Sequence, residues 1–535
     1  MRDERVYEFI DAEIAAARVQ RGQIGNPLAV RSLAIAGAAR PHLTAAADVI
    51  NPPELAWRYD PVAWLQHRGR AETWSKQREI IEALVTHRKV AVRSSHGPGK
   101  SFIASRTVGW WLDVHPAGDA FAITTAPTDP QVKAILWREI NKMHVLADLK
   151  GRTNLSEWYM GNELVALGRK PSDHNPAAFQ GIHARFVLVV LDEACGIPKT
   201  LWDSASTLAT NEYGRMLAIG NPDDPHSEFA KICQPGSGWH VIHISTLDTP
   251  NFTGEPVSRA LAEMMPSREW YEDRKLSWGE TSAIFRSKVL GEFPTEGDPF
   301  TTVPYAWASR CRYNELVPDD GNVQAGIDVG GGGDRTVMFE RRGQVAGRVE
   351  TFRDADPMRS VGRLVEKINE WGVHVVKVDS TGIGWALAGR LKELSSKHNA
   401  AGIQTGGTTH AAEIIPVNAG TGPSPRLVKQ RLNKRAELWW DVGRENSRLN
   451  AWDLTNVDDD VIAELCEPRY EILDSGGKIK IERKDEVIKR LGRSPDLADA
   501  LLLAFYDARR PARGASPGGL EELASKNLLS GIKPI

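Results

Sequence analysis

The stretch that most constrains the fold of this chain is residues 89–102, KVAVRSSHGPGKSF. Residues 90–92 form a short apolar run of the kind found in a buried strand, and a glycine-containing turn follows it. Residues 99–101, Gly-Lys-Ser, then open a helical pattern that continues over residues 102–112. This order of strand, turn and helix N-terminus is typical of a P-loop, whose backbone N–H groups surround phosphate oxygens.

In such a loop Lys100 would reach the β- and γ-phosphates of ATP, and the Ser101 hydroxyl would bind Mg²⁺. Ser94 stands where the pattern G-x-x-x-x-G-K-[ST] has its first glycine, so the match also allows an ordinary turn. The expected nucleotide contacts in this loop are Ser94, Ser95, His96, Gly97, Pro98, Gly99, Lys100 and Ser101. A P-loop needs acidic partners elsewhere in the chain to form a catalytic site.

Those partners follow the apolar run at residues 186–191, FVLVVL, which predicts a strand covered on both faces of a parallel sheet. Asp192 and Glu193 come directly after it, at the edge where α/β sheets place their ligands. We expect Asp192 to hold Mg²⁺ and Glu193 to polarise the attacking water. Taken alone, the same residues would fit a strand followed by a helix cap.

Two further residues are candidate nucleotide contacts. Gln77 lies with Trp74 just upstream of the P-loop strand, where such residues often contact adenine, although a helix cap beside a core tryptophan fits equally. Asn221 follows the predicted strand 215–219 and is placed to sense the γ-phosphate; a simple Gly-Asn-Pro turn is the alternative.

Composition limits the class of protein. A chain of 535 residues predicts two or three domains, and 41% hydrophobic with 25% charged residues is ordinary for a soluble globular protein. No apolar run reaches the roughly 18 residues of a membrane span, so no membrane association is expected. The 4 scattered cysteines predict a reducing compartment without zinc or disulfides. With a net charge of −2, nucleic-acid binding would depend on local basic patches.

Acidic residues mark a second site in the C-terminal half. Asp328 lies in the predicted strand 324–330, and Asp379 follows another at residues 373–378. Asp496 and Asp499 begin an apolar helix and, three residues apart, share one of its faces. Each could be a turn, a strand end or a cap, but the order strand-Asp, strand-Asp, helix-Asp matches a ribonuclease H-like nuclease. There the carboxylates hold two divalent metals that assist phosphodiester hydrolysis.

Basic residues supply candidate DNA contacts. Residues 425–443 predict an amphipathic helix on which Arg431, Lys434 and Arg435 share a face that fits a DNA backbone or plain solvent. Lys484 is a candidate neighbour of the metal site or of a phosphate.

Together these segments resemble the large subunit of a tailed-bacteriophage terminase, the motor that packages DNA into procapsids. The resemblance covers roughly residues 60–507. The motifs that carry it are SSHGPGKS (94–101), TTAPTDPQV (124–132), VLVVLDEA (187–194), AIGNP (218–222), FRSKVLGEFP (285–294), GIDVG (326–330), VDSTGIG (378–384) and RSPDLADAL (493–501).

The resemblance implies an α/β chain with a P-loop ATPase domain of the additional-strand type, with a mainly parallel sheet, and then a ribonuclease H-like α/β nuclease domain. The implied domains are an N-terminal helical region (1–70), the ATPase domain (71–300, with a lid or linker subdomain near 237–300), a linker (301–322), the nuclease domain (323–507) and a flexible tail (508–535). Implied cofactors are ATP with Mg²⁺, and Mg²⁺ or Mn²⁺ at the nuclease site, held by Asp328, Asp379 and Asp496 or Asp499.

Implied partners are double-stranded DNA, the small terminase subunit and the portal protein, with a homo-oligomeric ring, commonly a pentamer, forming on docking. The implied location is the host cytoplasm, transiently at the portal vertex of the procapsid and not in the mature virion. Many relatives carry an arginine inside the P-loop that this chain lacks, which leaves Arg93 and Arg185 as candidates for a finger that completes a neighbour's site.

Two other functions fit part of the sequence. A helicase-nuclease of DNA repair or recombination would share the ATPase motifs, but no second helicase lobe follows residue 300. A structural component at the portal with a vestigial nuclease would not need every candidate acidic residue, and all are present.

Overall fold

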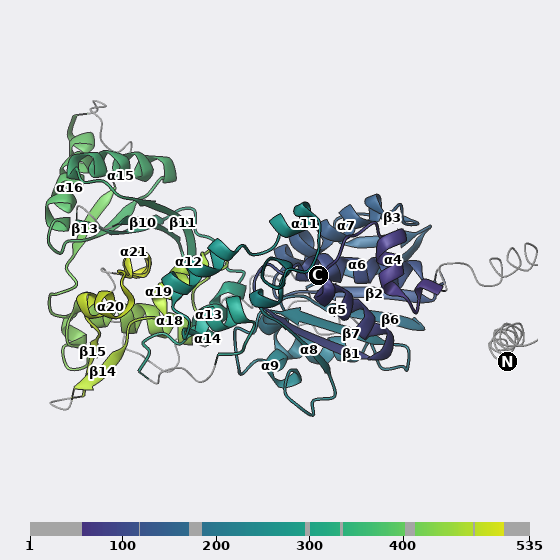
Figure 1. Cartoon of the computed structure of the whole chain (residues 1–535). Coiled ribbons are helices and arrows are strands. Elements are labelled where there is room, and N and C mark those ends of the chain that lie inside the picture. The colour runs from purple at the N-terminus through teal and green to yellow at the C-terminus, as the bar shows by residue number, and fades with distance from the viewer. Residues whose placement is uncertain are drawn as a thin grey trace, which may run out of the picture.

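The computed structural model describes residues 56–116, 118–170, 184–294, 300–331, 335–401, 412–473 and 477–507. Within them the chain forms two bodies, each built on its own sheet (Figure 1). None of the described helices has the length and apolar character needed to cross a bilayer. Most of the helical region expected at residues 1–70, and the tail expected at 508–535, lie outside the described residues.

The first body contains an eight-stranded sheet in the order β3-β4-β5-β2-β6-β7-β1-β8. Its strands are parallel except for the edge pairs β3–β4 and β4–β5, which confirms the mainly parallel sheet. The strand predicted at residues 186–191 is β6, lies near the middle and is buried throughout. The bounds are β1 Lys89–Ser94, β2 Ala120–Thr125, β3 Arg152–Thr153, β4 Glu157–Met160, β5 Glu163–Gly168, β6 Phe186–Leu191, β7 Arg215–Gly220 and β8 His240–Ile244.

Helices cover both faces of this sheet because alternate strand residues are apolar on both sides. Leu188 and Val190 of β6 pack with one group of helices, whereas Val187 and Val189 pack with the other. The first group is α4 (Pro61–His67), α5 (Ser75–Thr86), α6 (Lys100–Asp113) and α7 (Trp137–Leu146), the last preceded by a π-helical segment, Gln131–Leu136. The second group is α8 (Lys199–Ser206) and α9 (Glu228–Ile232). The carboxyl ends of the parallel strands therefore remain available for a site.

A run of short helices joins the two bodies (Figure 1). Trp278 and Phe285 of this run pack in the core of the second body. The same run also touches the P-loop, because the backbone N–H of His96 donates to the Lys288 carbonyl over 2.7 Å. Its helices are α10 (Pro250–Thr253), α11 (Arg259–Glu263), α12 (Arg268–Trp278), α13 (Ala283–Phe285), a π-helical segment Arg286–Leu290, and α14 (Tyr305–Arg310).

The second body contains a five-stranded sheet in the order β11-β10-β9-β12-β13. β9, β10 and β11 are antiparallel neighbours, whereas β12 pairs in parallel with both β9 and β13. This is the ribonuclease H-like α/β arrangement predicted from the order of the acidic residues. The bounds are β9 Val323–Asp328, β10 Thr336–Arg342, β11 Val345–Phe352, β12 Val375–Asp379 and β13 Glu413–Val417.

Helices α15 (Pro357–Trp371) and α16 (Gly384–Ala401) cover one face of this sheet, and α21 (Asp496–Phe505) covers the other. α21 lies so close to β9 that a Cβ on Gly326 would overlap the backbone of Ala500 and Ala504. Glycine at position 326 therefore permits the close approach that brings the start of α21 to the end of β9.

The amphipathic helix predicted at residues 425–443 is wrong as a single element. The chain makes one short turn at Pro425–Leu427, then α17 (Lys434–Glu437), a π-helical segment Leu438–Arg444, and α18 (Glu445–Arg448). The break arises because the N–H of Leu432 donates to the carbonyl of Ile479 in β15 (Lys478–Ile481), and Asn433 caps a new helix. Tertiary pairing thus overrides the helical periodicity. The remaining elements are α19 (Asp459–Leu465), β14 (Tyr470–Leu473) and α20 (Lys484–Leu491).

Candidate nucleotide and metal sites

The P-loop connects the end of β1 to the start of α6. Gly97 and Gly99 have φ angles of 79° and 85°, in the left-handed region that glycine adopts without strain. Ser94, at the position of the missing first glycine, is the last residue of β1 and has extended backbone that any residue can adopt. The departure from the usual motif therefore carries no conformational cost.

The start of α6 offers unsatisfied donors to an anion. Among the described residues, no acceptor is bonded to the backbone amides of Lys100 and Ser101, and the buried Ser95 hydroxyl has no partner. The Lys100 ammonium donates to the Ser95 carbonyl over 3.0 Å, and burial lowers the pKa of Lys100. These free donors and the inward-facing lysine fit a polyphosphate.

Ser101 and Asp192 form the part of this site that fits a cation. The Ser101 hydroxyl donates to the Asp192 carboxylate over 3.3 Å. Burial, and then repulsion from Glu193, raise the pKa of Asp192 to about 7. Glu193 itself has a φ of 46°, which is strained for a residue other than glycine and is typical of functional positions. A divalent cation between Ser101 and Asp192 would remove the cost of burying the carboxylate.

The side chains of Gln77 and Asn221 donate hydrogen bonds to backbone carbonyls of the P-loop. The Gln77 amide donates to the carbonyls of Pro98 and Gly99 over 3.4 and 3.3 Å, and the Asn221 amide donates to the Ser94 carbonyl over 2.7 Å. Both side chains therefore support the loop in this structure. An adenine contact for Gln77 and γ-phosphate sensing for Asn221 stay predictions.

Asp223 is a residue that sequence reasoning missed, although it stands only two positions after Asn221. Its buried carboxylate accepts hydrogen bonds from Lys288 over 2.9 Å, from Tyr305 over 3.0 Å, and from Ser287. Burial alone would raise the pKa of Asp223, but Lys288 and these hydrogen bonds hold it below its usual value. The loop after β7 is thereby tied to the run of helices that reaches the second body.

The two candidate finger arginines occupy different places. The Arg93 guanidinium donates to the Gly291 carbonyl over 3.3 Å. Arg185 precedes the amino end of β6 and stacks on the rings of Phe186 and Tyr213, whereas Asp192 follows the carboxyl end of the same strand. Which of them would complete a neighbour's site stays open.

The strand register of the second sheet places Asp328 and Asp379 side by side. Ile327 of β9 pairs with Val378 of β12 in a parallel register, so the residues that follow them lie at adjacent strand ends. Neighbouring strands lie about 4.8 Å apart, and these two side chains have the same phase of the strand repeat. Residues 51 positions apart in the sequence thus meet at one edge.

The ammonium of Lys484, at the start of α20, lies between three of the predicted carboxylates. Its ammonium lies 2.9 Å from an oxygen of Asp328, 3.0 Å from one of Asp496 and 3.3 Å from one of Asp499. The predicted convergence of the first and last acidic residues is therefore present in the structure. The cation at its centre is the lysine that the sequence suggested as a neighbour of the site.

The carboxylates of this cluster differ in their ionisation. Burial raises the pKa of Asp328 well above its usual value, and Asp499 and Asp496 add to this effect although Lys484 opposes it. Burial also acts on Asp499, but the Arg435 guanidinium and Lys484 hold the pKa of Asp499 below its usual value. Of Asp328 and Asp499, Asp499 is therefore the more firmly ionised, and its carboxylate already accepts a bond from Arg435 over 3.1 Å.

Asp379 takes a different arrangement. Its carboxylate accepts hydrogen bonds from the backbone N–H and the hydroxyl of Thr381, over 2.9 and 2.8 Å. Over the described part of the chain, no three His, Cys, Asp or Glu side chains are arranged to hold a metal ion. Three carboxylates surround the positive charge of Lys484, so the cluster offers oxygen ligands of the type that divalent cations prefer, although their present arrangement does not hold one. Metal binding would require Lys484 to move and Asp379 to turn from Thr381.

Glu464 of α19 positions this site and was missed by sequence reasoning. Its carboxylate accepts hydrogen bonds from the backbone N–H groups of Leu497 and Ala498, over 2.7 and 3.3 Å, at the start of α21. It also pairs with Arg335 and Arg493, while burial raises the pKa of Glu464 to about 7. No local motif marks such a residue, because its partners are distant in the sequence.

The shared exposed face predicted for Arg431, Lys434 and Arg435, whether for a DNA backbone or for solvent, is wrong. Arg431 pairs with Asp441 over 2.7 Å, Lys434 pairs with Glu437 over 2.7 Å, and Arg435 pairs with Asp499. The three side chains are largely buried and serve internal ion pairs, so they form no shared exposed face.

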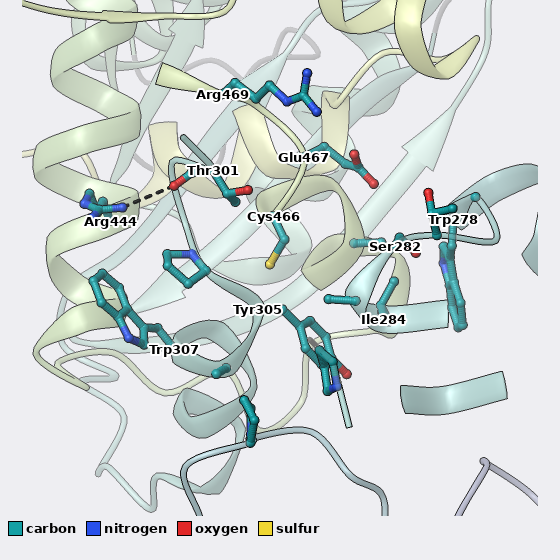
Figure 2. A pocket seen from close by; sticks show the side chains of 18 of the residues that line it. Trp278, Ser282, Ile284, Thr301, Tyr305, Trp307, Arg444, Cys466, Glu467 and Arg469 are labelled. Carbon is teal, nitrogen blue, oxygen red and sulfur yellow. Dashed lines mark hydrogen bonds between the residues drawn. The ribbon is translucent and has the colours of Figure 1, made fainter. Parts of the chain in front are cut away.

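A cavity of about 520 Å³ lies between the bodies, apart from both sites (Figure 2). Trp278, Tyr305 and Trp307 line it with Cys466 and Arg444. The Arg444 guanidinium donates to the carbonyls of residues 301 and 302 and stacks on Trp307. Its charge is therefore used in contacts within the protein.

No family model matches this chain. A curated relative, the "Probable terminase, large subunit" of Enterobacteria phage P7, is 24% identical over 265 residues, which is 46% of this chain. The match spans 50% of that relative's length.

Solved structures are also similar, at low TM-scores. The large terminase of a thermophilic bacteriophage covers 81% of this chain and 98% of its own at 11% identity and a TM-score of 0.38. The ATPase domain of Thermus phage P74-26 large terminase covers 43% of this chain and 97% of its own, at 20% identity and a TM-score of 0.33. A point mutant of the nuclease domain of the large terminase subunit gp2 of bacterial virus Sf6 covers 40% of this chain and 100% of its own, at 18% identity and a TM-score of 0.33. The resemblance to phage large terminase subunits, indicated by the sequence motifs, is confirmed by the curated relative.

Proposed function

We propose that this chain drives double-stranded viral DNA into procapsids with energy from ATP and cuts concatemeric DNA with a metal-dependent nuclease. The observation that carries the proposal is the acidic cluster around Lys484, at the strand ends of a ribonuclease H-like sheet in the same chain as a P-loop. Buried carboxylates that repel one another are costly unless a cation neutralises them, and here the Lys484 ammonium supplies that charge between the three carboxylates.

In the first body, the chain's own groups can bind and orient ATP. The amides at the start of α6 would bind the phosphates, and Lys100 would leave the Ser95 carbonyl to reach the β- and γ-phosphates. Ser101 and Asp192 would hold Mg²⁺, which supplies charge neutralisation on the phosphates when bound. Glu193, held in its strained conformation beside Asp192, would orient the attacking water and accept its proton.

In the second body, Asp328, Asp379, Asp496 and Asp499 would hold the catalytic metals. When bound there, divalent metal would supply activation of the attacking water and stabilisation of the leaving oxygen. Displaced from the carboxylates, Lys484 would keep its positive charge within reach of the scissile phosphate. Arg435 and Trp439, which donate to Asp499 over 3.1 and 3.0 Å, would orient that carboxylate.

The partners are part of the same proposal, supported by the resemblance to large terminase subunits. They are the small terminase subunit, the portal protein and further copies of this chain in a ring, commonly a pentamer. The protein would act in the host cytoplasm, docking transiently at the portal vertex of the procapsid. Arg93 or Arg185 would then complete the nucleotide site of a neighbouring copy.

A packaging assay tests the proposal. Full-length protein, procapsids and linear double-stranded DNA are mixed with ATP, and DNA protected from an added nuclease is measured. We expect protection with the unaltered chain, none with Lys100→Ala, and protection without end cleavage for Asp328→Asn. Absence of protection and of metal-dependent plasmid cleavage by the unaltered chain would reject the proposed function.

A further inference from the structure

Trp385 stands apart from every other tryptophan of the chain. All 17 tryptophans lie in the described residues, and Trp385 is the one whose side chain is exposed, with 75% of its surface accessible. The others are buried or half-buried in the cores and their margins. A large aromatic side chain left in water is informative, because tryptophan usually gains much from burial.

The position of Trp385 is fixed relative to the nuclease site. The loop after Asp379 turns back at once: Gly384 donates to the Thr381 carbonyl, and a Cβ on Gly384 would overlap the backbone of Asp379. Gly384 thus lies directly against the backbone of Asp379 at the end of β12, and Trp385 is the next residue along the chain. Helix α16 starts here, and helical side chains lean toward the N-terminus of their helix. The Cα–Cβ bond of Trp385 is therefore tilted toward the start of α16, which follows the strand end that carries Asp379.

The fold does not use this ring. The buried face of α16 is formed by Leu387, Ala388 and Leu391, which pack against the second sheet. Trp385 falls on the opposite face, and its neighbour one turn later is Gly389, which has no side chain to cover it. Ile383, with 42% of its surface exposed, extends the apolar surface along the loop.

We propose that Trp385, with Ile383 beside it, is a DNA-positioning contact of the nuclease, packing its ring against the sugar and base edges in the minor groove next to the scissile phosphate. This inference rests on the nuclease function proposed above. It assigns Trp385 to binding and orientation, with the chemistry left to the carboxylates.

The chemistry of duplex DNA favours this occupant. A phosphodiester placed at the ends of β9 and β12 would bring the adjoining groove toward the start of α16, where Trp385 lies. The sugar and base edges of a groove are the apolar parts of a nucleic acid, and proteins that bind the minor groove insert apolar side chains there. The acidic cluster binds phosphate only through metals, so an apolar contact beside it would supply affinity that the carboxylates do not.

The inference is tested by the binding of a labelled duplex to the Asp328→Asn chain, which we expect to bind DNA without cutting it. Added Trp385→Ala should weaken duplex affinity by about tenfold, in the range measured for losing one aromatic–base contact. Trp385→Phe should restore most of the affinity, because the ring is retained. Tyr59→Ala is the matched control: Tyr59 is also an exposed aromatic, at 69%, but lies in the first body, and its removal should leave affinity unchanged.

Tryptophan fluorescence supplies an independent readout of contact. In the Asp328→Asn chain, duplex DNA should reduce quenching by acrylamide, and the reduction should disappear with Trp385→Phe. Thermal stability and ATP hydrolysis of the Trp385→Ala chain should change little, since 75% of the Trp385 surface is exposed.

Unchanged duplex affinity in Trp385→Ala, or quenching that DNA does not alter, would overturn the inference and leave Trp385 to a protein partner. Failure of the nuclease function itself appears separately, as absence of metal-dependent cleavage by the unaltered chain. The two failures are therefore distinguishable.

Discussion

Replacing Lys484 by alanine tests the central feature of the acidic cluster. The Lys484 ammonium touches Asp328, Asp496 and Asp499 at 2.9, 3.0 and 3.3 Å, where a metal ion would lie. Removing it takes away the ion-pair partner of Asp328, whereas Arg435 still lies 3.1 Å from Asp499 and Arg335 lies 3.6 Å from Asp496. We expect the metal-free variant to be less stable than the unaltered chain and to bind divalent metal more tightly.

The magnitude follows from the geometry of the cluster. Removing one partner of a fully buried ion pair costs about 3–5 kcal/mol. The Lys484 side chain keeps 35% of its surface exposed, so solvent screens part of the attraction. We therefore expect a loss of about 2 kcal/mol in the metal-free protein. Metal must displace the same ammonium, and about 2 kcal/mol corresponds to roughly 30-fold tighter metal binding when it is absent.

Thermal unfolding at increasing Mn²⁺ concentration measures both effects. Lys484→Ala should unfold at a lower temperature without metal and should recover at a Mn²⁺ concentration about 30-fold below that needed to shift the unaltered chain. Lys489→Ala, an exposed lysine on the same helix, is the matched control and should change neither quantity. Equal Mn²⁺ midpoints for the variant and the unaltered chain would refute the competition between lysine and metal.

The remaining predictions concern the two sites separately. Lys100→Ala should lose nucleotide binding and hydrolysis together. Glu193→Gln should keep nucleotide binding but hydrolyse ATP about 10²-fold more slowly in a steady-state assay. Normal turnover of the Glu193 variant would show that the catalytic assignment is wrong. Asp328→Ala should abolish plasmid cleavage in Mg²⁺ or Mn²⁺ and leave ATP hydrolysis intact, and a cleaving variant would exclude this residue as a ligand. Because the pKa of Asp192 is raised to about 7, this carboxyl holds a proton below pH 7 that the cation must displace. As the pH is raised toward 7, the affinity for Mg²⁺ with nucleotide should therefore rise by up to about tenfold per pH unit, and it should level off above pH 7. The proton released on binding should be detectable by calorimetry in buffers of different ionisation enthalpy. A constant affinity between about pH 5.5 and 8 would contradict this assignment.

The sequence alone determined the elements whose signals are local. The apolar runs at residues 90–92 and 186–191 became β1 and β6, because an uninterrupted apolar strand is stable only inside a covered parallel sheet. The glycines of the P-loop specified a turn that few other residues adopt, and the acidic residues at strand ends specified the edge of each sheet that holds a site. These features depend on neighbours within a few residues, so a single sequence reveals them.

Only the tertiary structure decided which groups meet. The break in the helix predicted at residues 425–443 comes from pairing with β15, which lies some 50 residues further along the chain. The same packing commits Arg431 and Arg435 to internal carboxylates, which no helical pattern could show. Lys484 at the centre of the acidic cluster and the exposed ring of Trp385 likewise follow from contacts between distant segments. Distances between such segments are set by strand register and by how helices pack on a sheet, and these depend on the whole chain at once.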